Sequence, residues 1–101
     1  MLDIKVRNMT STRANQIPNQ FIINVDDKKI FQSYDSIITV VNYSDDTITF
    51  GSDWKYSNTT SKYRTLFLSE LGIHATTSEI QDAINNNGSL GRYKVLYSED
   101  V

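Results

Sequence analysis

The sequence of 101 residues contains no cysteine, one histidine and one proline. Without cysteine, disulfides and thiolate metal sites are excluded, and this composition is typical of a cytosolic protein. A single histidine, His74, is too few for a histidine-based zinc site or catalytic triad. The four glycines are not arranged as a phosphate-binding loop. The sequence therefore predicts neither a bound metal ion nor a cofactor.

Long apolar runs are also missing, and neither sign of charge is in large excess. No stretch approaches the ~20 apolar residues of a membrane helix, and residues 1–5 do not resemble a signal peptide. The net charge is −2, which fits neither a basic nucleic-acid binder nor a strongly acidic mimic of nucleic acid. We therefore expect a cytoplasmic protein that makes no contact with a membrane.

The chain does contain enough apolar material for one core. Hydrophobic residues make up 39% of it, and its aromatic residues are six tyrosines, four phenylalanines and one tryptophan. Chains of about 100 residues lie at the commonest size for a single domain. We therefore predict one domain over residues 1–101.

Alternating apolar and polar residues predict short strands joined by turns. The strands are expected at residues 3–8, 20–25, 28–34, 36–43, 47–50 and 92–98. Asp26-Asp27 and Asp45-Asp46 are expected to lie in tight turns between strands, because aspartate tolerates turn dihedral angles. The polar segment 9–19, which holds Pro18, is expected to form a long loop that leads directly into the next strand.

Two helices are expected between the fifth strand and the last one. The first is predicted from about Thr60 to Leu71, with Thr59 or Thr60 as its N-cap. The second begins at a capping box formed by Thr76 and Glu79. The predicted fold class is α+β: an antiparallel sheet of five to six strands, with two short helices packed on one face and inserted before the last strand. That last strand is expected either at an edge of the sheet or beside the first strand.

No set of residues in the sequence is typical of catalysis. The pairs Asp26-Asp27 and Asp45-Asp46 lack the spacing of a calcium loop, and we expect both to be solvated turns. His74 lies in the connector between the helices, where we expect it to bond to nearby backbone. The protein is therefore predicted not to be an enzyme. A nuclease that uses the aspartates with a metal ion is the least favoured alternative.

The segment from Trp54 to Arg64 is a candidate binding surface. It mixes three aromatic with three basic residues: Trp54, Lys55, Tyr56, Lys62, Tyr63 and Arg64. Such a mixture suits stacking on bases, or a protein interface in which Trp, Tyr and Arg contribute most of the binding energy. Alternatively, Trp54 and Tyr56 pack under the helix and fix it to the sheet. Lys62 and Arg64 are expected on the surface, because they are too polar for the core.

Three stretches of the chain form a distinctive pattern: NQIPNQFII at residues 15–23, FQSYDSII at 31–38 and WKYSNTTSKYRTLFL at 54–68. Together they resemble a family of small proteins from phages and mobile elements of Firmicutes and related bacteria, whose function is not established. The first strand and the short Asp45-Asp46 turn depart from that pattern. In size and composition the chain is also similar to anti-CRISPR proteins, including inhibitors of type II Cas9.

The resemblance implies a function by binding a host macromolecule in the bacterial cytoplasm. The first hypothesis is an inhibitor that blocks the assembly of Cas9 or its loading with nucleic acid. The acidic turns would face a basic channel of that effector. The candidate partner-binding residues are Asp26, Asp27, Asp45, Asp46, Trp54, Tyr56, Lys62 and Arg64. The alternative is a nucleic-acid-binding accessory protein that uses Lys5, Arg7, Arg13, Lys62 and Arg64 with the tyrosines.

Overall fold

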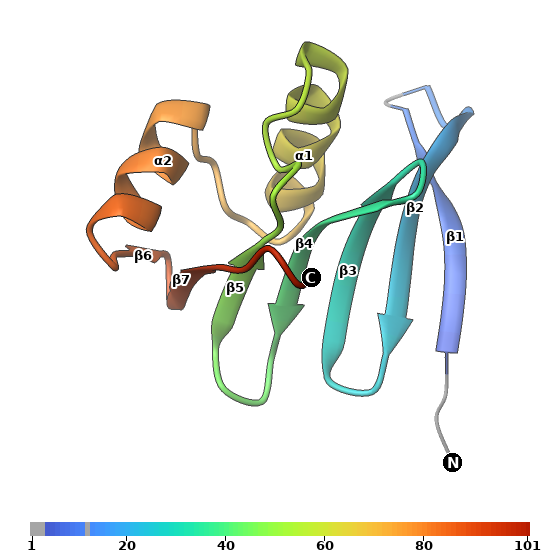
Figure 1. Cartoon of the computed structure of the whole chain (residues 1–101). Helices are drawn as coiled ribbons and strands as arrows, with labels where there is room; N and C mark the ends of the chain where they lie inside the picture. The colour runs from blue at the N-terminus through green and yellow to red at the C-terminus, as the bar shows by residue number, and fades with distance from the viewer. Residues whose placement is uncertain (1–3, 12) are drawn as a thin grey trace.

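The computed structural model describes residues 4–11 and 13–101 (Figure 1). Within these residues, seven strands form one sheet in the order β1-β2-β3-β4-β5-β7-β6. The strands are β1 (Ile4–Thr10), β2 (Gln16–Val25), β3 (Lys28–Ser33), β4 (Ser36–Asn42), β5 (Thr47–Phe50), β6 (Ser89–Leu90) and β7 (Tyr93–Tyr97). The helices are α1 (Asn58–Glu70) and α2 (Thr77–Asn85).

The predicted α+β class is confirmed, and both helices precede the last strand as expected. The sheet is larger than predicted, and it is mixed because β7 runs parallel to β5. A parallel partner requires a long crossover, and here the connection carries both helices. The last strand therefore lies at the opposite end of the sheet from β1, where only the two-residue β6 follows it.

The expected long loop at residues 9–19 is wrong, because most of that segment is strand. β1 continues to Thr10 and β2 already begins at Gln16. The buried side chains of Met9 and Ile17 hold this segment in the core. A register shift between Asn8 and Thr10, with Asn19 at a φ of 63°, accommodates the extra residues. The polar composition of residues 9–19 did not predict strand, because only two apolar residues, Met9 and Ile17, hold this segment in the core.

One face of the sheet packs against the helices to form the core. Phe31 on β3 stacks on Phe67 of α1, with ring centroids 5.7 Å apart. Ile48 on β5 and Val95 on β7 are buried in the same cluster, as is Ile80 of α2. Burial of each such side chain contributes about 1.5–3 kcal/mol, so the helices are held to the sheet mainly by apolar contact. No helix among the described residues is long and apolar enough to cross a membrane.

The N-cap of α1 is Ser57, so the expected cap at Thr59 or Thr60 is wrong. The Ser57 hydroxyl accepts a hydrogen bond from the Thr60 amide at 3.1 Å. Serine is as good a cap as threonine, and the helix begins two to three residues earlier than expected. Gly72, with a φ of 78°, follows the helix end, since glycine adopts this conformation without strain.

The capping box of α2 is confirmed and provides a direct stability test. The Thr76 hydroxyl accepts from the Glu79 amide at 3.1 Å, and the Thr76 amide donates to Glu79 Oε1 at 3.1 Å. We expect Thr76→Ala to lower the free energy of unfolding by about 1 kcal/mol, because one amide of the first turn loses its acceptor. Urea unfolding measures this loss. Ser78→Ala is the matched control, and an equal loss in both variants would contradict the role of the cap.

Candidate functional site

The structure places both acidic turns at one end of the sheet (Figure 1). Asp26-Asp27 joins β2 to β3, and Asp45-Asp46 lies in the turn between β4 and β5. The two turns are linked, because the Tyr43 amide donates to the Asp27 carbonyl oxygen at 2.8 Å. All four aspartates are exposed, as predicted for solvated turns.

Basic groups compensate part of the charge at this end of the sheet. Arg92 Nε lies 3.4 Å from Asp46 Oδ1, and Lys28 follows directly after Asp27. Lys94 is the register partner of Thr47, the residue after Asp46. The acidic turns therefore lie beside basic side chains.

The expectation that Arg64 lies on the surface is wrong. Its side chain is 0% exposed, and that of Trp54 is 3% exposed. Arg64 Nη1 donates to the Trp54 carbonyl oxygen at 3.0 Å, and Nη2 donates to Thr77 Oγ1 at 2.8 Å. Its guanidinium carbon lies 5.1 Å from the centre of the Trp54 ring. Neither side chain is accessible to a partner; together they join the segment before α1 to the first turn of α2.

Arg64 is a buried cation that pairs with no carboxylate among the described residues. Its Nε atom also has no hydrogen-bond partner there. Burial lowers the pKa of Arg64, because the charged guanidinium loses its hydration. The carbonyl and hydroxyl acceptors and the Trp54 ring replace that water only in part. Trp54 thus follows the alternative reading, in which it fixes the helix to the sheet.

Tyr56 and Lys62 remain exposed, but they lie far from the acidic turns. Tyr56 is 80% exposed, and Lys62 sits over the Tyr63 ring at 5.3 Å. The segment between β5 and α1 leaves the sheet at the end opposite the acidic turns (Figure 1). The predicted site residues therefore form two separate groups.

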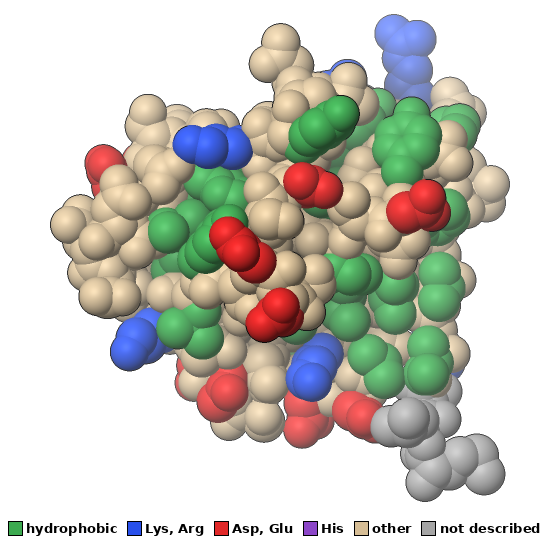
Figure 2. Space-filling view, in the orientation of Figure 1, with side chains coloured by type: hydrophobic (Ala, Val, Ile, Leu, Met, Phe, Trp, Pro, Cys, Tyr) green, Lys and Arg blue, Asp and Glu red, His purple; other side chains and the backbone are tan. Residues whose placement is uncertain are grey.

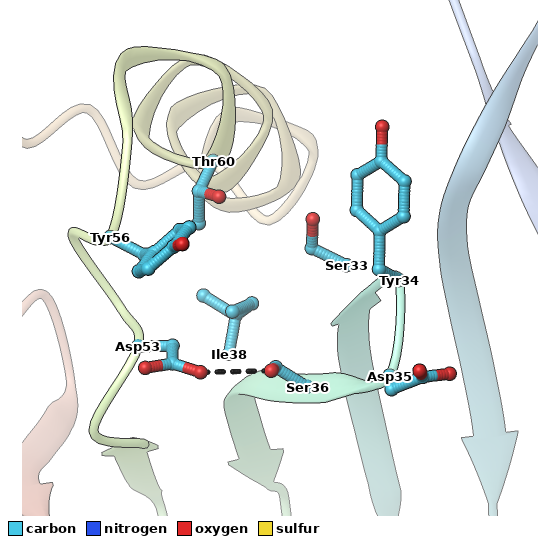
Figure 3. A pocket seen from close by; sticks show the side chains of 8 residues that line it. All are labelled: Ser33, Tyr34, Asp35, Ser36, Ile38, Asp53, Tyr56 and Thr60. Atoms are coloured by element: carbon cyan, nitrogen blue, oxygen red, sulfur yellow. Dashed lines mark hydrogen bonds between the residues drawn. The ribbon is translucent and has the colours of Figure 1, made fainter.

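Tyr56 borders a hollow of about 350 Å³ between the β3–β4 turn and the start of α1 (Figure 3). The side chains around it are Ser33, Tyr34, Asp35, Ser36, Ile38, Asp53, Tyr56 and Thr60. None of these residues is basic. Apart from Tyr56, the sequence analysis assigned no binding role to them.

An unusual backbone conformation places Tyr34 at the mouth of this hollow. Tyr34 has a φ of 53° in a two-residue turn between Ser33 and Ser36. Asparagine or glycine is usual at such a position, since a bulky side chain is strained there. The turn is held by the Tyr34 amide, which donates to the Asn19 carbonyl oxygen at 2.7 Å, and by Gln32 Nε2, which donates to the Tyr34 carbonyl oxygen at 2.6 Å. The sequence analysis placed Tyr34 in the strand predicted at residues 28–34, so it gave no signal for this feature.

A second feature is the sheet face that the helices leave uncovered. Cross-strand pairing places one row of side chains across six strands: Val6, Ile23, Ile30, Val40, Thr49 and Leu96. Val6 is 59% exposed and Ile4 beside it is 56% exposed. Figure 2 is seen from this side of the sheet, and it shows hydrophobic side chains gathered over strands β1 to β4. We call this surface the open face.

Residues 4–87 match DUF8033, a family of unknown function. The chain belongs to this family. The match includes β1, so the first strand is part of the DUF8033 pattern, although it departed from the pattern described above. No curated protein and no solved structure matches this DUF8033 chain.

Proposed function

We propose that this DUF8033 protein binds a host protein and blocks it through the open face. The observation that carries the proposal is the mainly apolar row of side chains from Val6 to Leu96, across a sheet face that the helices leave uncovered. Monomeric proteins rarely expose large contiguous apolar surfaces, and those that occur often mark protein interfaces. The resemblance to phage and anti-CRISPR proteins supplies the partner: a Cas9 effector of the bacterial host.

The arrangement of charges around the open face favours a protein partner over a nucleic acid. Lys28 and Asp45 line a hollow on this face together with Ile30 and Val40. An apolar centre with a border of mixed charge is the usual anatomy of a protein interface. A nucleic-acid surface requires clustered lysine and arginine to neutralise phosphates.

One observation supports nucleic-acid binding as a second candidate. Lys62 lines a hollow between α1 and the β1–β2 connection, together with Ser11 and Ile17. Lys5 and Arg7 on β1 are exposed and point to the helix side of the sheet, as their pairing with Asn24 and Ile22 indicates. Arg64 is buried and cannot take part. Binding to RNA or DNA that falls steeply with salt would support this function.

The protein-partner proposal is tested by capture of Cas9 with the purified protein, with and without guide RNA. We expect a complex in one of the two states and at least a tenfold loss of affinity for the double variant Val6→Lys, Leu96→Lys. Both side chains are exposed, so lysine is tolerated there without loss of the fold.

The control is Asn24→Lys, which adds one lysine, as each half of the double variant does, on β2 at an exposed position of the opposite face. The control should bind as the wild type does. The absence of a complex in both guide states would remove Cas9 as the partner. Equal binding by the double variant and the wild type would remove the open face as the interface.

A further inference from the structure

We propose that the hollow between Tyr34 and Tyr56 is a receptor for an arginine side chain. The proposal rests on the proposed function in one respect, because the arginine would belong to the bound protein. The hollow is separate from the open face, and it is formed by two loops and the first turn of α1. For brevity we call it the tyrosine hollow.

The charge of the tyrosine hollow suits a cation. Asp53 is half-buried, and no lysine or arginine lies among the lining residues. The Asp35 side chain is exposed and points away from Asp53, so Asp53 supplies the charge inside the hollow (Figure 3). The Ser36 hydroxyl donates to Asp53 Oδ2 at 2.8 Å, which fixes that carboxylate against β4 (Figure 3). A carboxylate oriented in this way can accept paired hydrogen bonds from a planar guanidinium.

The Ser33 side chain adds a hydroxyl group to the tyrosine hollow. Ser33 is only 5% exposed, and Figure 3 shows its hydroxyl directed into the hollow. No hydrogen bond joins it to the other lining residues that the figure draws. A donor group that enters the hollow would pair with this oxygen.

Aromatic and apolar groups complete the fit to arginine. Tyr34 is 60% exposed and Tyr56 is 80% exposed, so both rings are available at the mouth. A guanidinium stacks favourably on an aromatic face. Ile38 provides an apolar floor for the aliphatic part of the side chain. The strained backbone at Tyr34 supports a functional role, since such strain concentrates at binding sites.

The probe is N-acetyl-arginine methylamide, followed by its effect on the backbone amide NMR signals of the protein. We expect saturable shifts confined to residues 33–36 and 53–60. The neutral analogue N-acetyl-citrulline methylamide has nearly the same shape and should bind at least tenfold more weakly. Equal binding of the two compounds, or no saturable binding of the arginine compound, would overturn the proposal.

Two variants separate binding from folding. Tyr34→Gly removes the ring and relieves the positive φ, so we expect unchanged or greater stability with at least fivefold weaker arginine binding. Asp53→Asn retains an oxygen acceptor for Ser36 but removes the charge, and it should weaken binding to a similar extent. Asp82→Asn, at an exposed position of α2, is the charge-matched control. Normal arginine binding by both Tyr34→Gly and Asp53→Asn would contradict the assignment.

Inorganic phosphate is the competing ligand, because Thr60 lies in the first turn of α1, where anions are favoured. Saturable phosphate shifts at residues 33–36 and 53–60 would overturn the arginine proposal. The arginine titration needs no partner protein. Arginine binding without capture of Cas9 would therefore support the receptor and reject the proposed partner, and capture without arginine binding would do the reverse.

Discussion

Replacing Arg64 with alanine is expected to lower the free energy of unfolding by about 3–4 kcal/mol. The substitution removes a fully buried side chain and leaves a cavity beneath the Trp54 ring. It also leaves the Trp54 carbonyl oxygen and the Thr77 hydroxyl without their donor. The release of a poorly hydrated buried charge offsets part of this loss. Equilibrium unfolding in urea measures the total.

Arg64→Met separates the contributions of packing and hydrogen bonding. Methionine fills much of the volume of the arginine stem and carries no charge, so we expect a loss of only about 1–2 kcal/mol. Lys62→Ala, two residues earlier and exposed, is the control and should change stability by less than about 0.5 kcal/mol. A stable Arg64→Ala protein would contradict the burial of this guanidinium.

Gly51→Ala is expected to destabilise the protein by about 2–3 kcal/mol because of a clash with backbone. A Cβ atom at residue 51 would lie 2.5 Å from the Ile37 carbonyl oxygen. The Gly51 amide donates to the Ile38 carbonyl oxygen at 3.0 Å. Residue 51 therefore cannot move away from β4 without loss of that hydrogen bond. Thermal or urea unfolding of the purified variant measures the loss.

Gly72→Ala is the comparison for this test. Gly72 has a φ of 78°, but a Cβ atom there would meet nothing within 4 Å. Its replacement should therefore cost only the backbone strain of a left-handed residue, about 1 kcal/mol. A larger loss at Gly72 than at Gly51 would show that dihedral strain, and not the contact with β4, is the dominant effect.

Features set by residues close in the chain were predicted best. The Asp26-Asp27 turn, the strand at residues 47–50 and the capping box of Thr76 and Glu79 all depend on short-range patterns. The N-cap of α1 was placed too late, because several neighbouring serine and threonine residues can cap a helix equally well. The exposed position of Lys62 also followed from its polarity, whereas the exposure of Tyr56 contradicts the alternative in which it packs under the helix.

The candidate sites depend on residues far apart in the chain. Ser36 and Asp53 are 17 residues apart and meet across the tyrosine hollow. Arg64 and Thr77 are 13 residues apart and meet in the core. Polarity alone places an arginine outside, whereas the carbonyl and hydroxyl acceptors that stabilise it inside come from other elements. For the same reason, the sequence did not indicate that Tyr34 and Tyr56 border the same hollow.

By itself, the sequence determined the α+β class, the hairpins and the insertion of both helices before the last strand. Only the tertiary structure decided that β7 pairs in parallel with β5, that Arg64 is buried, and that one apolar face of the sheet stays uncovered. Alternation along a strand shows that its two faces differ. Which face receives the helices depends on packing between distant segments, and no local pattern encodes it.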